Sequence, residues 1–308
     1  MKQVEERYIS LLTDFGFKRI FGTAMNKDLL ICFLNSLFNG KQVVKDVSYL
    51  NPEHVGDVYT DRRAIFDVYC EGENGEKFIV EMQNAYQAYF KDRSLFYSTF
   101  PIREQAPKGN DWDFKLNHVY TVALLNFNMN EDAFDKEKIR HHVQLCDTAT
   151  HKVFYDKLEF IYVEIAKFNK TLEQLDTLYE KWLYALKNLY KLTQRPKELC
   201  DKVFDRLFEE AEIAKFTPQE MREYEASKKA YRDIKNSIDT AKQEGLAEGI
   251  EIGMEKGMEK GIEKGRAEGK HEANTETAQR LLAMGLSAEQ VAKATQLPLE
   301  IIKNLSNS

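Results

Sequence analysis

The sequence predicts a globular part of the α/β or α+β class, followed by a helical C-terminal extension. Helical patterns and strand-like apolar runs are mixed over roughly the first 215 residues, as expected for helices packed on a sheet. Hydrophobic residues make up 43% of the 308-residue chain, which is enough to bury at least one sizeable core. From Gly245 onward, seven glycines recur at every fourth position, so this segment needs a separate interpretation.

The first predicted element is a helix over residues 13–39, in which phenylalanines and leucines recur with a helical period. Gly40 is expected to end this helix. Two strands are expected next, at residues 64–70 and 77–83, because both are apolar runs bounded by turn residues. Together they predict a β-hairpin.

An unusually aromatic helix is predicted over residues 85–100, closed by Pro101 and Pro107. Residues 118–127 form a nearly continuous apolar run, which is typical of a strand buried at the centre of a sheet. Residues 158–165 indicate a further strand. The globular part therefore contains several strands with helices between them.

Three helices are expected after the last strand. Thr171 with Gln174 is a capping-box pair that predicts a helix reaching about Leu192. A second helix is expected to end near Lys215. The third begins at Thr217, where a capping residue, a proline and a glutamate follow in the preferred order.

The composition excludes several classes of site. No run of about 18 apolar residues is present, so a spanning helix and a membrane partner are not expected. The first twelve residues lack an apolar secretory core, which predicts a cytoplasmic protein. The cysteines are far apart, which argues against a zinc site or a disulfide framework. The adjacent His141 and His142 suggest a solvated turn rather than a pair of metal ligands. Phosphate-binding glycine loops are absent. The net charge of −6 argues against a broad nucleic-acid coat but allows a local basic groove.

The hairpin has two possible registers, and burial distinguishes them. A two-residue turn at Asn74-Gly75 would place Gln83 on an apolar face. A three-residue loop with a left-handed Gly75 instead makes one face wholly apolar, which fixes register strongly. The apolar pairs expected in this register are Phe66 with Met82, Val68 with Val80, and Cys70 with Phe78.

This preferred register places Asp67 directly opposite Glu81, with Gln83 beside them on the same face. Opposed side chains have Cβ atoms about 5 Å apart, and two carboxylates at that separation share either a proton or a cation. Their hard oxygen atoms suit Mg²⁺ or Mn²⁺. The alternative is an exposed face on which water screens both charges, and the hairpin alone leaves both interpretations open.

Three segments of the sequence, including this hairpin, resemble those of a known family. Asp67 followed by Glu81-Met82-Gln83 resembles the Asp…Glu-x-Gln signature of the PD-(D/E)xK nuclease family transposases, which include the Rpn-type recombination-promoting nucleases of bacteria. The segment Thr13 to Gly22 resembles the family's opening block, and Asp92 to Tyr97 resembles its helix after the motif. The resemblance covers roughly residues 1–130.

The resemblance implies an α/β fold with a PD-(D/E)xK restriction-endonuclease-like core, in which a central mixed sheet is flanked by helices. It implies that Asp67 and Glu81 ligate a divalent cation, Mg²⁺ or another such as Mn²⁺, and that Asp14 adds an acidic group near the metal. Gln83 stands where the wider superfamily has lysine. A neutral amide orients water but cannot stabilise charge as an ammonium does, so the role of Gln83 stays open.

The function expected from this resemblance is metal-dependent hydrolysis of DNA phosphodiester bonds in recombination or transposition. Lys18, Arg93 and Tyr97 are candidate contacts to the DNA backbone. A solvated lysine and a packed helix whose arginine pairs with an acid are equally acceptable interpretations of these residues. Arg62 and Arg63 either line the approach to the site or are solvated.

Two alternatives to an active nuclease stay open. One is a catalytically silent oligomeric interaction protein that retains the nuclease fold, and the other is a DNA-binding module whose hairpin is only structural. The aromatic cluster Tyr86, Tyr89 and Phe90 offers rings for stacking on bases, but such clusters are more often core packing, which is the interpretation preferred from the sequence.

The glycine repeat over residues 245–272 carries an apolar, an acidic and a basic stripe beside the glycine stripe. Each interior glycine costs about 1 kcal/mol relative to alanine, so a lone helix of this sequence is marginal. A second helix would recover the loss, because glycine allows close approach and the apolar stripe supplies burial. The repeat therefore predicts either a homo-oligomer or a flexible linker.

Four parts of the chain are expected on these grounds. Residues 1–195 form the nuclease-like domain, 196–244 a helical extension, 245–272 the glycine repeat, and 273–308 a small unit that resembles a helix-turn-helix. In this last unit Lys303 is the only basic residue on the second helix, so docking to protein or capping is favoured over DNA binding.

Overall fold

The computed structural model describes residues 6–54, 64–106, 113–129 and 135–306. The chain divides into two compact units, 1–238 and 239–308. The four-part division expected from the sequence stays a prediction. Among the described residues, no helix combines the length and apolar character needed to cross a membrane.

The first unit is built on a six-stranded mixed sheet in the order β1-β4-β5-β6-β8-β7. Its central strands β5, β6 and β8 are parallel, and the remaining pairs are antiparallel. Two short strands, β2 and β3, form a separate antiparallel pair. The strands are β1 (Val47–Tyr49), β2 (Glu53–His54), β3 (Ala64–Ile65), β4 (Val68–Gly72), β5 (Lys77–Gln83), β6 (Val119–Leu125), β7 (Arg140–Cys146) and β8 (Val153–Glu164).

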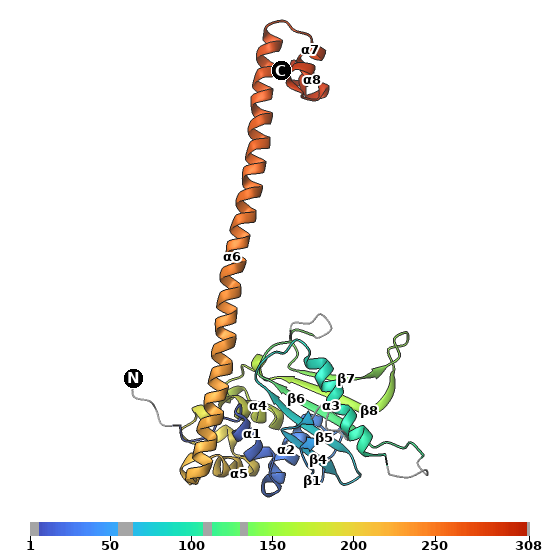
Figure 1. Cartoon of the computed structure of the whole chain (residues 1–308), viewed down its shortest axis with the longest axis vertical. Helices are drawn as coiled ribbons and strands as arrows, with labels where there is room; N and C mark the ends of the chain where they lie inside the picture. Colours follow the sequence, from blue (N-terminus) through green and yellow to red (C-terminus); the bar gives the residue numbers. More distant parts are fainter. Residues whose placement is uncertain (1–5, 55–63, 107–112, 130–134, 307–308) are drawn as a thin grey trace. The chain divides into compact units, whose positions relative to one another are not determined.

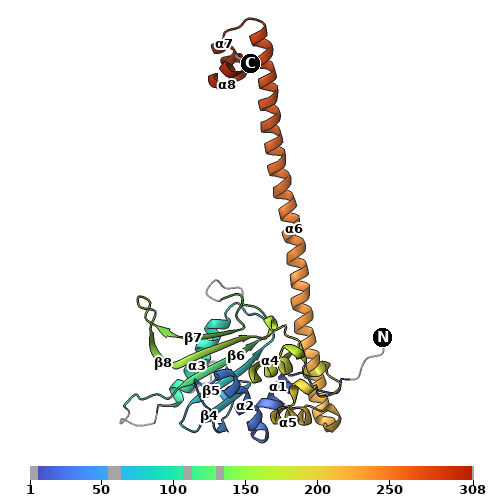
Figure 2. The same cartoon turned by 180° about the vertical axis from the view of Figure 1, so that it is seen from behind.

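Helices cover both faces of this sheet (Figures 1 and 2). On one face Phe78 and Val122 belong to a core shared with Phe33 and Trp182. On the other face Phe90 packs against residues of β6 and β8. The helices of the first face are α1 (Asp14–Phe21), α2 (Lys27–Phe38), α4 (Leu178–Asn188) and α5 (Lys202–Glu210), and that of the second is α3 (Phe90–Glu104). This mixed sheet flanked by helices confirms the predicted α/β fold.

Strand β6 is buried along its whole length, from Val119 to Leu125. It lies between β5 and β8 and pairs in parallel with both. A strand covered on both faces buries successive side chains rather than alternate ones, which explains its continuous apolar run. The prediction of a buried central strand is confirmed.

The single helix expected over residues 13–39 is wrong, because the structure has two helices joined by a short 3₁₀ turn, Ala24–Asn26. Helix α1 ends at Gly22, whose N–H donates to the carbonyl oxygen of Lys18 at 2.7 Å. The side-chain amide of Asn26 donates to the carbonyl oxygen of Arg19 at 3.0 Å. This polar side chain replaces the next backbone donor and ends the first helix.

Two other helix boundaries differ from the predictions. Helix α3 begins at Phe90 and continues through Pro101 to Glu104. The proline lies in the last turn, so the one intrahelical hydrogen bond lost with its N–H falls where the helix is about to end. The capping box of Thr171 opens only the 3₁₀ turn Leu172–Gln174, and a second box at Thr177 opens α4.

The prediction of a solvated turn at His141 and His142 is wrong, because both residues lie in β7. His141 is only 7% exposed, and its Nε2 lies 2.8 Å from the carboxylate of the buried Glu164. Pairing of β7 with β8 brings these two residues together although they are 23 positions apart. A buried carboxylate partner is a tertiary feature that the adjacent histidines do not reveal.

The first turns of α6 (Pro218–Ala283) hold the start of α1 in place. This helix opens as predicted, with reciprocal bonds between Thr217 and Glu220 at 2.7 and 3.2 Å. The Oγ of Ser227 accepts a hydrogen bond from the N–H of Phe15 at 3.0 Å. That N–H is one of the donors that an isolated helix leaves unpaired. The orientation of α1 therefore depends on a segment about 210 residues further along the chain.

Replacing Tyr224 by phenylalanine is expected to lower the free energy of unfolding by about 1–2 kcal/mol. The buried Tyr224 hydroxyl accepts from the N–H of Ser10 at 3.1 Å and donates to Glu6 at 3.2 Å, so the variant leaves a buried donor unpaired. Urea denaturation measures the change. Tyr89→Phe is the matched control, since Tyr89 is 77% exposed. Equal losses in both variants would contradict this role.

The second unit contains the rest of α6, α7 (Ala288–Thr295) and α8 (Leu299–Ser306). Ser287 and Gln290 form the capping box that opens α7. Its small core is made of Ala278, Val291, Leu297 and Ile302. The glycine repeat is helical, and its apolar stripe is between 51% and 71% exposed at Leu246, Ile250, Met254, Met258 and Ile262.

Candidate active site

The β4–β5 hairpin has the predicted three-residue loop. Gly75 is left-handed, with φ of +81°, and the N–H of Gly72 donates to the carbonyl oxygen of Glu76 at 2.8 Å. Val68 pairs with Val80, and Cys70 pairs with Phe78. The preferred register is therefore confirmed along the regular part of the hairpin.

The apolar pair expected between Phe66 and Met82 is wrong. The chain bends at Asp67, and β4 begins only at the next residue. The N–H of Phe66 donates to the carbonyl oxygen of Pro52 at 3.0 Å, and its ring packs with Tyr69 on the face opposite to Met82. Strict alternation ends at this bend because the chain leaves β5 for a different partner.

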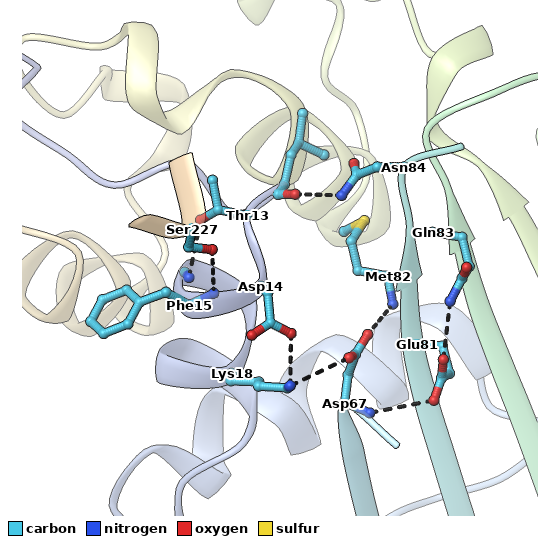
Figure 3. Close-up of polar contacts among 12 residues, drawn as sticks. Thr13, Asp14, Phe15, Lys18, Asp67, Glu81, Met82, Gln83, Asn84 and Ser227 are labelled. Atoms are coloured by element: carbon cyan, nitrogen blue, oxygen red, sulfur yellow. Dashed lines mark hydrogen bonds and ion pairs between the residues drawn. The ribbon is translucent and has the colours of Figure 1, made fainter. Parts of the chain in front are cut away.

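The Asp67 carboxylate lies beside Glu81 at this end of the hairpin (Figure 3). Asp67 Oδ2 accepts from the N–H of Met82 at 2.8 Å, and Glu81 Oε1 accepts from the N–H of Asp67 at 3.3 Å. Glu81 is 7% exposed, and the Asp67 side chain is 20% exposed. Side-chain and backbone hydrogen bonds thus hold two largely buried acids together where the backbone ladder stops.

Burial raises the pKa of both acids above the ordinary range. For Glu81 the neighbouring Asp67 adds to burial and raises the pKa to about 8. For Asp67 burial raises the pKa against the opposing effects of the Met82 N–H and of Lys18. The cations already present therefore compensate the two acids incompletely, which is the condition in which a further cation binds favourably.

Lys18 lies between two of these acids. Its Nζ is 2.7 Å from Asp14 Oδ1 and 3.8 Å from Asp67 Oδ1. Burial disfavours its charge, but the hydrogen bond that Lys18 donates to Asp14 and the charges of Asp14, Asp67 and Glu81 raise the pKa of Lys18 overall. Asp14 is 64% exposed, so it meets the site through this lysine at its solvent side.

Gln83 and Arg93 close the other side of the site. The amide nitrogen of Gln83 donates to Glu81 Oε2 at 3.0 Å, and Arg93 donates to the amide oxygen of Gln83. Arg93 also donates to Gln87 at 2.7 Å. Its guanidinium lies 5.7 Å from the ring centroid of Tyr97. A chain of polar contacts therefore runs from Arg93 through Gln83 to Glu81.

Among the described residues, the structure brings together the side chains that the sequence nominated for the site. Asp14 and Lys18 come from α1, the acids and Gln83 from the hairpin, and Arg93 and Tyr97 from α3. Sequence reasoning missed Gln87, which orients Arg93, and no motif marks it. Arg62 and Arg63 lie outside the described residues.

The aromatic cluster after the hairpin is only partly core. Phe90 is 4% exposed, as expected, but Tyr86 and Tyr89 are 54% and 77% exposed. The core interpretation is wrong for the tyrosines because α3 starts at Phe90, so the segment before it does not follow the helical period that would turn all three rings inward.

The donor set at the hairpin fits a hard divalent cation. Mg²⁺ is usually held in proteins by one or two carboxylates together with water and substrate phosphates. Asp67 and Glu81 supply two such carboxylates with incompletely compensated charge. Within the described ranges, no group of three or more His, Cys, Asp or Glu side chains is arranged to hold a metal ion. The fit is therefore to a cation whose remaining ligands come from water and substrate.

Comparison with known proteins gives the same family as the motif. Searches of curated proteins and of solved structures each found no match. The family model described as PD-(D/E)XK nuclease family transposase matches residues 11–241, which is about three quarters of the chain and includes every nominated site residue. The chain belongs to the PD-(D/E)XK nuclease family transposases.

Proposed function

We propose that this chain is a metal-dependent DNA endonuclease that hydrolyses phosphodiester bonds in recombination or transposition. The observation that carries the proposal is the largely buried pair Asp67 and Glu81, whose carboxylates are held together by backbone hydrogen bonds at 2.8 and 3.3 Å. Membership of a nuclease family supports the same activity. Two adjacent buried acids destabilise the fold when they ionise without a cation. A metal site needed for nuclease activity would explain why the chain has them.

In this proposal Asp67 and Glu81 hold Mg²⁺ or a similar ion. The bound cation would polarise the scissile phosphate and lower the pKa of the attacking water. Gln83 has a positioning role, because its two amide atoms are engaged by Glu81 and Arg93. It fixes the rotamer of Glu81 while remaining neutral.

The cations beside the pair are suited to the DNA backbone. The Lys18 ammonium, 3.8 Å from Asp67, would contact the phosphate that bridges the site. Asp14 holds that ammonium in place through its 2.7 Å ion pair. Arg93 would contact a neighbouring phosphate, with the Tyr97 ring 5.7 Å from its guanidinium. DNA is thus the proposed partner of this face.

Nicking of supercoiled plasmid tests the proposal. The wild-type protein is expected to nick plasmid with Mg²⁺ or Mn²⁺ and to stop when EDTA is added, while Asp67→Ala and Glu81→Ala do not cleave. Equal cleavage by all three proteins would overturn the site assignment. Absence of cleavage with intact DNA binding would instead support the silent interaction or DNA-binding alternative.

The glycine repeat is proposed to make the protein a homo-oligomer. Its apolar stripe is more than half exposed, and within the described residues none of the repeat's glycines would bring an added Cβ within 4 Å of another group. The space beside the glycines is therefore open for a second helix to approach closely. Acidic and basic stripes with the same four-residue spacing would pair across such an interface.

Replacing both Met254 and Met258 by lysine in the full chain is expected to convert the oligomer into a monomer, because the apolar stripe is interrupted at its centre. A chain ending at Lys242 should behave likewise. Light scattering measures the mass. As a control, Glu255 and Glu259 exchanged for glutamine should leave the apolar stripe intact and most of the oligomer in place. An unchanged mass for the double lysine variant would contradict this interface.

A further inference from the structure

Two tyrosine rings are exposed beside the candidate active site, and neither has a role in the proposed hydrolysis. Tyr86 and Tyr89 lie in the segment that joins β5 to α3 and are 54% and 77% exposed. Tyrosine usually buries most of its ring, so two such rings in one short segment are unusual for an inert surface.

Aromatic contacts fix the position of the Tyr86 ring. Its ring meets Phe127 edge to face, with centroids 5.6 Å apart and an interplanar angle of 85°. Phe127 in turn meets the buried Phe90 edge to face at 6.0 Å. The ring is therefore connected to the core through two aromatic contacts. A ring fixed in this way loses little conformational entropy when a ligand binds.

The chain places both rings close to the proposed catalytic groups. Tyr86 follows Gln83 by three residues, which limits their Cα separation to about 11 Å. The N–H of Arg93 donates to the carbonyl oxygen of Tyr89 at 3.0 Å, so Tyr89 is one helical turn from the arginine that contacts Gln83. At about 3.4 Å per stacked nucleotide, a strand crossing the site brings a nearby base within reach of the rings.

The charge of this segment favours nucleic acid over an acidic or basic protein partner. Between Glu81 and Lys91 the sequence contains no charged residue, so the ring surface does not repel phosphate. Arg93, which contacts Gln83 and Gln87, supplies positive charge next to it. An uncharged aromatic surface bordered by cations is typical of sites that bind unpaired strands.

We propose that Tyr86 and Tyr89 stack on an unpaired base next to the scissile phosphate, so that the preferred substrate is single-stranded or locally unpaired DNA. In an intact duplex, neighbouring bases cover the ring faces, and only a terminal, flipped or unpaired base offers one to a tyrosine. This inference rests on the proposed nuclease function, because it names the substrate class of the same site.

The test measures binding without cleavage, in buffer containing EDTA. Fluorescence anisotropy compares a labelled single strand, a duplex with a short unpaired gap, and a fully paired duplex. Tyr89→Ala is expected to lower affinity for the first two by about 5- to 100-fold and for the duplex less than 2-fold. Tyr89→Phe keeps the ring and should keep the affinity. Phe154→Ala removes another exposed ring, 82% exposed, and should change nothing.

A second set of oligonucleotides carries one abasic position, moved stepwise along the strand. At one position the missing base should weaken wild-type binding as much as Tyr89→Ala does, and the variant should lose nothing more there. Tyr86→Ala, checked for folding by circular dichroism, should show the same coupling at this or an adjacent position. Equal losses at every position, equal losses for the paired duplex, or no loss at all would overturn the stacking role.

Binding and cleavage separate the two proposals. If the wild-type protein cleaves plasmid but shows no base-dependent coupling to the tyrosines, the substrate inference fails and the nuclease function stands. If it cleaves nothing but the coupling is present, the nuclease function fails and the stacking surface stands. If the wild-type protein binds none of the three DNA forms, the stacking inference is overturned as well.

Discussion

Replacing Asp67 by asparagine is expected to reduce Mg²⁺-dependent DNA cleavage by at least about 10²- to 10³-fold while leaving the fold intact. The asparagine keeps an oxygen that accepts from the N–H of Met82, the contact made at 2.8 Å by Asp67 Oδ2. It removes the negative charge that a cation would share with Glu81. The hairpin therefore retains its geometry but loses half of its proposed metal ligands.

Initial rates of plasmid nicking over a range of Mg²⁺ concentrations measure this effect. The matched control is Glu73→Gln, because Glu73 is an exposed acid at the opposite end of the same hairpin. Its rate should stay within about twofold of the wild type, since single exposed charges contribute little. Nicking by Asp67→Asn at the wild-type rate would show that the reaction occurs elsewhere.

Replacing Glu81 by glutamine is expected to stabilise the metal-free protein at pH 8 by about 2 kcal/mol, although it abolishes cleavage. Burial and the neighbouring Asp67 raise the pKa of Glu81 to about 8 in the folded protein, well above its value in the unfolded chain. Glutamine resembles the protonated acid in shape and stays neutral. The variant therefore avoids the ionisation that weakens the native state.

The sign of the pH dependence follows from the direction of this shift. The folded state binds its proton more tightly than the unfolded state, so the stability contributed by neutral Glu81 is fully present below about pH 4. It is lost as the pH rises toward 8. The advantage of Glu81→Gln should therefore be absent near pH 4 and greatest near pH 8.

Urea denaturation at several pH values in EDTA measures this difference. Saturating Mg²⁺ should then reverse it, because a ligand present at a hundred times its Kd stabilises the wild type by about 2.7 kcal/mol. Glu73→Gln, which changes an exposed acid, should show neither effect. If the difference in stability between Glu81→Gln and the wild type did not vary with pH, Glu81 would not have the raised pKa on which this prediction depends.

The register of the β4–β5 hairpin could be predicted because it depends on residues close together in the sequence. Apolar alternation and the Asn74-Gly75 turn admit few registers, and burying one face selects a single one. Selecting that register places Asp67 and Glu81 side by side without knowledge of any other element. The bend at Asp67 could not be predicted in the same way, because it depends on a hydrogen bond from Phe66 to Pro52, outside the hairpin.

The burial of other groups also depended on distant parts of the chain. His141 is buried because β7 pairs with β8 and brings Glu164 to it. Tyr86 and Tyr89 are exposed because α3 begins only after them. Sequence periodicity reports the average environment of an element, and these residues lie where an element starts or where two strands meet.

The sequence by itself determined the fold class, the hairpin register, the family resemblance and the residue types of the site. These features follow from hydrophobic periodicity and turn chemistry, which act between near neighbours. Only the tertiary structure decided that Lys18 lies between Asp14 and Asp67, that Arg93 reaches Glu81 through Gln83, and that Ser227 supports α1. Those contacts join α1, the hairpin, α3 and α6, and their geometry is set by the packing of helices on both faces of one sheet.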